Sequence, residues 1–186
     1  MSTTAKITTA DDLFRLSDDG CRVELVAGEL RRRTPAGSEH GVISMELGSR
    51  LALHVRVEQL GVVFCAETGF LISRDPDTVL APDIAFVQRN RIETLGIPKA
   101  YFPAAPDLVV EVASPHDTLE QIDTKMRHWL TAGVSLAWLV HPACRRVTVY
   151  RSADDIGVLG EQDTLSGEAI VPGFACPVGE LFAGLR

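Results

Sequence analysis

The sequence predicts an α/β domain in which a central β-sheet is flanked by helices. Three observations predict this fold class. The length of 186 residues suits one domain. The hydrophobic fraction of 46% and the charged fraction of 23% are those of an ordinary globular protein. The middle of the chain mixes helical and strand-like patterns. We therefore expect a single domain over residues 1–186.

The first third of the chain predicts a short helix, a hairpin and a long helix. Thr9 is suited to cap a helix that continues to Leu16, because acidic residues fill its first turn. A hairpin follows around the turn Ala27-Gly28, and Ser38 is a plausible N-cap for a helix that runs to about Gln59. The two strands of the hairpin are Arg22–Val26 and Glu29–Arg33, and Thr34–Gly37 is a loop.

The central third predicts a series of strands. Apolar runs separated by turn residues indicate strands at Val62–Cys65, Gly69–Ile72, Ile84–Val87 and Leu108–Val112. A turn is expected at Asp75-Pro76-Asp77, and the polar, proline-rich segment from Gln88 to Pro106 is expected to be irregular. The run Leu108–Val112 is the strongest buried strand in the chain, and it contains one charged residue, Glu111.

The last third predicts one further helix and several strands. The segment from Thr118 to Ala132 is amphipathic at helical spacing, and Gly133 is suited to its C-terminal cap. Strands are expected at Ser135–Val140 and Val147–Arg151, and the tail to Arg186 is expected to form short strands and turns.

The charge balance excludes one class of function. The net charge is −7, from 18 basic and 25 acidic residues. Proteins that coat DNA without specificity need a dominant basic face, which this composition does not provide. An enzyme that gathers carboxylates around a metal ion is compatible with it, provided that a local patch of Arg and Lys contacts the nucleic acid.

The apolar stretches predict the cellular location, and the spacing of the cysteines predicts their redox state. No apolar run is long enough to span a bilayer, and residues 1–10 contain no apolar segment typical of a secretion signal. We therefore expect a cytoplasmic protein without membrane partners. The four cysteines are widely scattered, so we expect them to be reduced and not to bind zinc.

Two acidic residues are the main candidates for chemistry. Pro82 fixes the approach to Asp83, which directly precedes a strand, and Glu111 lies inside the most apolar strand. A buried ionised carboxylate is costly unless it is paired or binds a cation. Two carboxylates on neighbouring strands can converge on Mg²⁺, which prefers oxygen ligands and takes one or two protein carboxylates. The alternative is a salt bridge to a buried Arg or Lys, or a position at a sheet edge.

Lys125 is the candidate cation for the same site. It lies on the helix that follows the Glu111 strand, and a helix packed back over the sheet would bring its ammonium group into the cleft. An ammonium group there would stabilise charge that develops on a phosphate or would position the attacking water. The alternative is a solvated lysine paired with Gln121 or with nearby acidic residues.

Short motifs in a fixed order carry a family resemblance that extends from roughly Asp11 to Phe182. The motifs are Arg22–Leu30, Pro35, His40, Ala81–Ile84, Pro106–Pro115, Lys125–Trp129, Ala132–Val134 and Trp138–Pro142. In these residues and their order the chain resembles the Uma-two family of endonucleases, which belongs to the PD-(D/E)XK, or restriction-endonuclease-like, superfamily.

The resemblance implies a restriction-endonuclease-like fold and a Mg²⁺-dependent endonuclease, with Mn²⁺ as an alternative ion and DNA as the expected nucleic-acid partner. It implies that Asp83 and Glu111 bind the metal and that Glu24 adds a carboxylate. It implies that Lys125 supports the nucleophile or the transition state. His40 would contact a phosphate or assist proton transfer.

Three positions depart from the family pattern. The superfamily lysine usually lies two residues after the glutamate, where this chain has Ala113. Gln121 and His141 stand where the family usually has aspartates. The missing lysine at position 113 and the acidic net charge motivate an alternative function, a catalytically silent relative that binds nucleic acid or a protein partner.

Other patterns have simpler interpretations. His116-Asp117 suggests a metal-dependent phosphohydrolase, but suitably spaced histidines are missing, so a turn after the strand is favoured. Arg31-Arg32-Arg33 is interpreted as a solvated face in preference to a phosphate-binding patch. We expect a homodimer as one arrangement, because symmetric pairs suit nucleases that cut both strands. The apolar residues considered for its interface are Phe70, Phe86, Phe102, Trp129 and Trp138.

Overall fold

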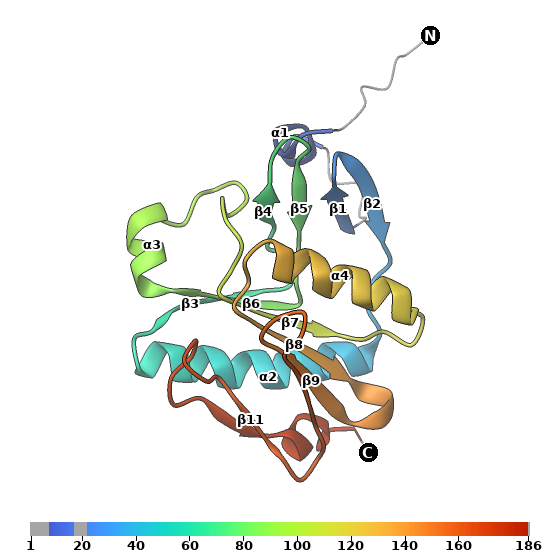
Figure 1. Ribbon diagram of the computed structural model, residues 1–186, viewed down its shortest axis with the longest axis vertical. Helices are drawn as coiled ribbons and strands as arrows, with labels where there is room; N and C mark the ends of the chain where they lie inside the picture. The colour runs from blue at the N-terminus through green and yellow to red at the C-terminus, as the bar shows by residue number, and fades with distance from the viewer. Residues whose placement is uncertain (1–7, 17–21, 186) are drawn as a thin grey trace.

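The computed structural model describes residues 8–16 and 22–185, and it confirms an α/β fold with a mixed central sheet flanked by helices (Figure 1). The six-stranded central sheet has the order β10-β9-β8-β7-β6-β3. Its strands are β3 (Gly61–Cys65), β6 (Ile84–Gln88), β7 (Leu108–Val112), β8 (Leu136–His141), β9 (Arg146–Tyr150) and β10 (Ile156–Leu159). Neighbouring strands are antiparallel except β7 and β8, which are parallel.

A second sheet of four antiparallel strands has the order β2-β1-β5-β4. Its strands are β1 (Arg22–Val26), β2 (Glu29–Arg33), β4 (Phe70–Ser73) and β5 (Thr78–Leu80), and it stands beside α4 above the central sheet in Figure 1. The short helix α1 (Ala10–Phe14) packs its buried Ala10 and Leu13 against this sheet. Thr9 caps α1 as expected, because its side chain accepts from the backbone of Asp12.

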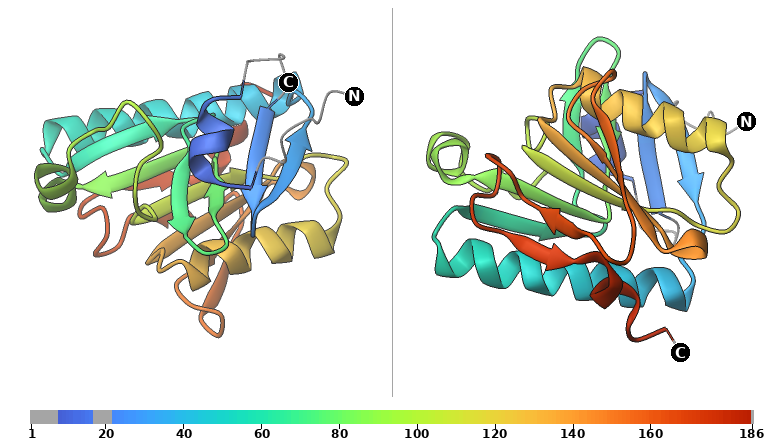
Figure 2. Two further views of the ribbon diagram at one scale, coloured as in Figure 1. Left: turned by 90° about the horizontal axis from the view of Figure 1, so that it is seen from above. Right: turned by 60° about the horizontal axis from the view of Figure 1, so that its bottom comes forward.

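The two faces of the central sheet are covered by different helices, as Figures 1 and 2 show. The first is α2 (Ser38–Val57), which buries Ile43, Leu47, Leu51 and Val55 against one face. The second is α4 (Leu119–Thr131), which buries Met126 and Trp129 against the other. Successive residues of a strand point to opposite faces. Leu108, Val110 and Val112 therefore belong to the core under α2, and Val109 belongs to the core under α4.

The remaining elements complete the edges of the domain. They are α3 (Arg89–Leu95), the 3-10 turns η1 (Pro142–Cys144) and η2 (Val178–Phe182), and the hairpin strands β11 (Thr164–Ser166) and β12 (Ala175–Pro177). The C-terminal segment packs beside α2, where Leu181 and Phe182 join the core. None of the helices in the described part of the chain is long and apolar enough to cross a membrane.

Several sequence-based expectations are corrected by the structure. The segment from Gln88 to Pro106 contains helix α3, and the strand β5 follows the Asp75-Pro76-Asp77 turn. Gly37 is the N-cap of α2, with Ser38 as its first helical residue, and the helix ends at Val57. Cys65, Cys144 and Cys176 are not bridged, as expected, while Cys21 lies outside the described residues.

The expected dimer interface is also corrected. Phe70, Phe86, Phe102, Trp129 and Trp138 are each at most 2% exposed, so these residues form the core and cannot form an intermolecular surface. The exposed large apolar residues lie elsewhere, and four of them are on α2.

Candidate functional site

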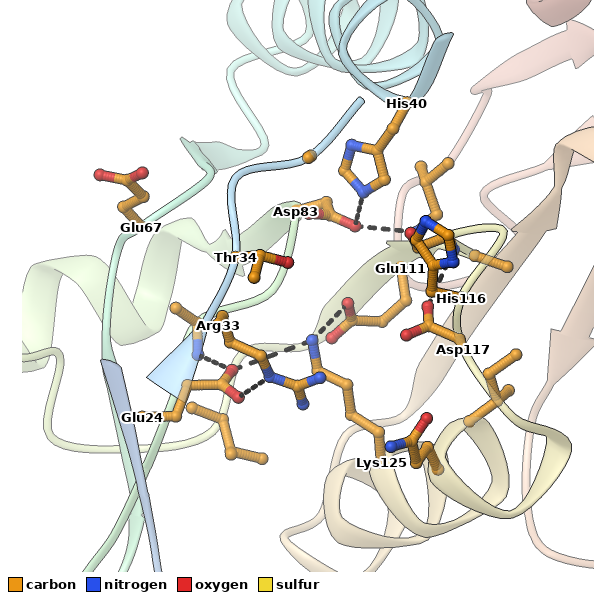
Figure 3. A pocket seen from close by; sticks show the side chains of 18 of the residues that line it. Glu24, Arg33, Thr34, His40, Glu67, Asp83, Glu111, His116, Asp117 and Lys125 are labelled. Atoms are coloured by element: carbon orange, nitrogen blue, oxygen red, sulfur yellow. Dashed lines mark hydrogen bonds and ion pairs between the residues drawn. The ribbon is translucent and has the colours of Figure 1, made fainter. Parts of the chain in front are cut away.

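A cavity of about 770 Å³ lies where the four-stranded sheet, the N-terminal end of α2 and helix α4 meet the central sheet. The five residues that the sequence singled out all line it (Figure 3). They are Glu24, His40, Asp83, Glu111 and Lys125. They come from β1, α2, the residue before β6, β7 and α4, so the fold gathers residues that are far apart in sequence.

The pairing of β6 and β7 places Asp83 beside Glu111. The antiparallel ladder pairs Phe86 with Leu108, Ala85 with Val109 and Ile84 with Val110. One further step of this register sets Asp83 opposite Glu111, on the face covered by α4. Directly opposite residues on antiparallel strands have Cβ atoms about 4.5–5.5 Å apart. The two carboxyl groups therefore share one region of the cavity because of strand register.

Asp83 is a buried carboxylate held by two donors. Its Oδ2 accepts a hydrogen bond from the backbone N–H of Val112 at 2.8 Å and lies 3.0 Å from His40 Nε2. Burial alone would raise the pKa of Asp83. The hydrogen bond and charge of His40, followed by the charge of Lys125 and the Val112 N–H, outweigh burial and hold the pKa below its usual range.

Glu111 is buried at the centre of the fold, and it is 6% exposed. Its Oε2 accepts from Lys125 Nζ at 2.7 Å, and its Oε1 accepts from the indole Nε1 of Trp129 at 2.8 Å. Burial raises the pKa of Glu111 to about 7; Lys125 opposes this rise, and the negative charges of Asp83 and Glu24 add to it. The ionised form of Glu111 is thus disfavoured mainly by burial and, to a smaller extent, by its acidic neighbours.

Lys125 reaches the cavity from the middle of α4. Its Nζ contacts Glu111 and also lies 3.8 Å from Glu24 Oε1. Burial would lower the pKa of Lys125, but the surrounding carboxylates, Glu111 foremost, raise it, so the amine is protonated at neutral pH. Gln121 is engaged elsewhere, in the capping box of α4 with Thr118. The alternative interpretation of Lys125 as a solvated helix residue is therefore wrong.

Glu24 is held by a cation that the sequence interpretation set aside. Its Oε1 accepts from the backbone N–H of Ala81 and its Oε2 from Arg33 Nε, both at 3.1 Å. The Arg33 side chain is 43% exposed, and it lines the same cavity. Arg33 is exposed, as the expected solvated face requires, but its guanidinium group also pairs with the buried Glu24. The available signal was the hairpin register, which pairs Glu24 with Arg31 and so places Arg33 on the same face.

His40 joins α2 to the acidic cluster. It lies in the first turn of the helix, where its Nε2 contacts Asp83 and its Nδ1 lies 3.4 Å from Ser44 Oγ. The imidazole is thereby oriented by contacts on both ring nitrogens, as is common for histidines that transfer protons or hold a metal ligand in place.

The charges and donor atoms of the site fit a divalent cation. When all three carboxyl groups, Glu24, Asp83 and Glu111, are ionised, they face two cations, Lys125 and Arg33, so the cluster then carries a net charge of minus one if His40 is neutral. In residues 8–16 and 22–185, no three or more His, Cys, Asp or Glu side chains are grouped to hold a metal ion. A metal site here would therefore use the carboxylates of Asp83 and Glu111 and complete its shell with water, as Mg²⁺ commonly does.

The His116-Asp117 pair forms a turn. Asp117 Oδ2 accepts from the backbone N–H of Ser114 at 2.8 Å and so stabilises the turn that connects β7 to α4. This hydrogen bond gives Asp117 a role in the turn that the sequence favoured, and the turn is confirmed; His116 and Asp117 both line the cavity.

Comparison with known proteins identifies relatives of this arrangement. Residues 10–179 match the model of the Uma2 family, which is described as "Putative restriction endonuclease". The fold is similar to the crystal structure of "a putative nuclease belonging to DUF820" from Anabaena variabilis ATCC 29413. The TM-score is 0.81 and the sequence identity is 21%, over 96% of this chain and 99% of that chain. No curated protein matches the sequence.

Proposed function

Since the chain belongs to the Uma2 family of restriction-endonuclease-like proteins, we propose that it is an endonuclease that hydrolyses DNA phosphodiester bonds with a divalent metal ion. One observation carries the proposal. The β6–β7 register brings Asp83 beside Glu111, and Lys125 contacts the same glutamate from α4. Two hard oxygen ligands and one ammonium group in a single cavity are suited to phosphoryl chemistry.

In this proposal Asp83 and Glu111 hold Mg²⁺, with Mn²⁺ as an alternative. When bound, the ion supplies a water of lowered pKa and neutralises phosphate charge. Glu24 lies at the same site, where it pairs with Arg33 and Lys125, and in this proposal it adds a carboxylate near the ion.

The other polar residues have separate tasks. Lys125, which is protonated at neutral pH, stabilises the charge that develops on the phosphate in the transition state. Arg33 lies half exposed in the cavity and supplies guanidinium N–H groups for the substrate phosphate. His40 holds Asp83 in place and is available to transfer a proton. Lys125 and Arg33 thus supply local positive charge that can contact DNA phosphates, although the whole chain has a net charge of −7.

The experiment measures cleavage of plasmid and single-stranded DNA in Mg²⁺, Mn²⁺ or EDTA. The wild type is compared with Asp83→Asn and Glu111→Gln, and Glu93→Gln on α3 serves as a matched control for a carboxylate outside the cavity. We expect metal-dependent cutting by the wild type and the control, and none by the two site variants. Metal-loaded, folded wild-type protein that binds DNA without cutting it would instead support the catalytically silent alternative. Cutting that persists in both site variants would contradict the proposed site.

We further propose that the protein forms a homodimer through the exposed face of α2. Val42, Met45, Leu53 and Val57 are 45–69% exposed and lie along one side of the helix, opposite its buried side. They are distributed almost symmetrically about Ser49. If two copies of α2 cross antiparallel at Ser49, Met45 of one lies opposite Leu53 of the other and Val42 lies near Val57. Such a self-complementary surface is what a two-fold interface requires.

A further inference from the structure

Helix α4 places two hydrogen-bond donors on one carboxyl group. Lys125 and Trp129 are four residues apart and so lie on the same side of the helix. Lys125 Nζ donates to Glu111 Oε2 at 2.7 Å, and Trp129 Nε1 donates to Glu111 Oε1 at 2.8 Å. Each oxygen of Glu111 is therefore engaged by a different side chain from a single turn of α4.

The two donors restrict how the carboxyl group can rotate. The terminal torsion of a glutamate is broad and has little intrinsic preference, so its orientation depends on its hydrogen-bond partners. A carboxylate oxygen can accept more than one hydrogen bond or metal contact, so neither donor blocks a cation from the same oxygen. An indole N–H does not titrate and cannot accept a hydrogen bond, so the donor side of this contact does not change with pH.

The packing of Trp129 makes this contact rigid. Trp129 is 0% exposed in the core under α4, which also contains Met126 and Val109. An indole fixed on all sides presents its N–H in one direction only. Glu111 in turn lies on β7, which is hydrogen-bonded to β6 and β8 on its two sides. The contact thus joins a fully buried residue of α4 to an inner strand of the central sheet.

Trp138 provides an internal comparison. It is also 0% exposed, but it lies on the opposite face of the sheet. There it stacks with Phe174, and the two ring centroids are 5.7 Å apart. Its Nε1 has no hydrogen-bond partner among the residues that the structure describes. The chain has only two tryptophans. One therefore serves packing alone, and the other adds a hydrogen bond to a candidate metal ligand.

We propose that Trp129 is a positioning residue that fixes the Glu111 carboxylate in the orientation in which it binds the divalent cation. The proposal rests on the proposed metal-dependent function. It assigns the indole to the support of a metal ligand, a role in which substitutions commonly weaken metal affinity or activity by about 10–100-fold.

The first measurement is a Mg²⁺ titration of ¹⁵N-labelled protein, followed through the two indole N–H cross-peaks. Trp129→Phe and Trp138→Phe assign the peaks. We expect the Trp129 peak to shift saturably as Mg²⁺ binds and the Trp138 peak to stay in place. In Glu111→Gln the Mg²⁺-dependent shift should vanish. A Trp129 peak that does not respond while backbone peaks of the cavity do respond would overturn the proposal.

The second measurement is the affinity for Mn²⁺ by calorimetry. We expect Trp129→Phe to weaken it roughly 10–100-fold, and Trp138→Phe, which removes an indole of equal burial, to change it less than about twofold. Equal losses in both variants would mean a general packing effect and would overturn the proposal. If Trp129→Phe does not fold, benzothienylalanine at position 129 keeps the ring shape and removes only the N–H.

The outcomes separate this proposal from the proposed function. If the wild type binds neither Mg²⁺ nor Mn²⁺, the metal-dependent function fails and the role of Trp129 falls with it. If the wild type binds the ions and the folded variant without the indole N–H binds them equally well, only the role of Trp129 is overturned.

Discussion

Lys125 Nζ lies 2.7 Å from Glu111 Oε2, although the two residues belong to different elements of the fold. The superfamily that the sequence resembles carries its lysine on the strand, two residues after the glutamate, and this chain has Ala113 there. In the structure α4 folds back over β7 and delivers the ammonium group from the helix. Glu111 thus has a lysine partner from α4, although position 113 on the chain is alanine.

Substitution of Lys125 should remove activity without preventing metal binding. Lys125→Met keeps much of the aliphatic length and removes the charge that would face the phosphate. We expect kcat for DNA cleavage to fall by about 10²–10³-fold, in line with the loss of one preorganised donor to transition-state charge. Lys99→Met, at an exposed lysine outside the cavity, is the matched control. Wild-type kcat in folded Lys125→Met would show that the ammonium group has no part in the reaction.

Arg33 should act on substrate binding. Its guanidinium group lines the cavity, whereas Arg31, on the same strand face, pairs with Glu29 and lies outside the cavity. We expect Arg33→Ala to weaken DNA binding by roughly tenfold, the size of one charged hydrogen bond. The plot of log affinity against log salt concentration should become less steep by about one unit, which is the contribution of one phosphate contact. Arg31→Ala should change both quantities much less, and equal effects would indicate a diffuse basic surface.

The pKa of Glu111 predicts how stability changes with pH. Its folded value of about 7 exceeds the ordinary value of 4.5, so the folded state holds this proton more tightly than the unfolded state. Ionisation of Glu111 therefore costs stability, and the cost grows from about pH 4.5 and is complete above about pH 7. At full ionisation it is roughly 3 kcal/mol.

The measurement is Tm against pH in EDTA for the wild type and Glu111→Gln. Only the change with pH is compared, because the amide alters the contacts with Lys125 and Trp129 at every pH. We expect the Tm of the wild type to fall relative to that of the variant, by several degrees, between pH 5 and 8. Parallel curves would mean that Glu111 titrates in its ordinary range.

The regular elements of the fold were predictable from the sequence, and the exceptions have physical causes. Apolar runs and helical spacing predicted the hairpin β1–β2, the buried strand β7 and the helix α4, and their bounds agree within about two residues. β5 has only three residues, and it follows a proline turn too closely to show a pattern. Helix α3 has seven residues, no side-chain cap and no buried residue, so it leaves no periodic signal.

The site residues that could be predicted are the charged residues that stand within or beside apolar strands. A glutamate inside an apolar strand and an aspartate at a strand start are conspicuous, and the structure brings Asp83 and Glu111 together. Arg33 and Trp129 were not found. Arg33 belongs to a charge run of an ordinary kind, and Trp129 is a core residue whose hydrogen bond depends on how α4 approaches β7. Such contacts arise from tertiary packing, which local patterns do not contain.

The proposed α2 interface gives the last prediction. Leu53 is 62% exposed on the outer side of α2, whereas Leu95 is 42% exposed at the end of α3. In an antiparallel pair, glutamate at position 53 would be buried against Met45 of the second copy, and its desolvation would destabilise the dimer. In the monomer the same side chain faces water and costs little, so Leu53→Glu should be a folded monomer with an unchanged far-UV spectrum.

Sedimentation and light scattering at several concentrations measure the mass. We expect a dimer for the wild type and for Leu95→Glu, which introduces the same charge at an exposed leucine away from α2. A monomeric wild type at the highest soluble concentration would contradict the interface, as would a dimer that survives Leu53→Glu. Because position 53 lies far along α2 from His40 at the cavity, cleavage of single-stranded DNA should persist in the monomer. If Leu53→Glu loses only the ability to cut both strands of a duplex together, the α2 interface is needed for the two active sites to act on one duplex.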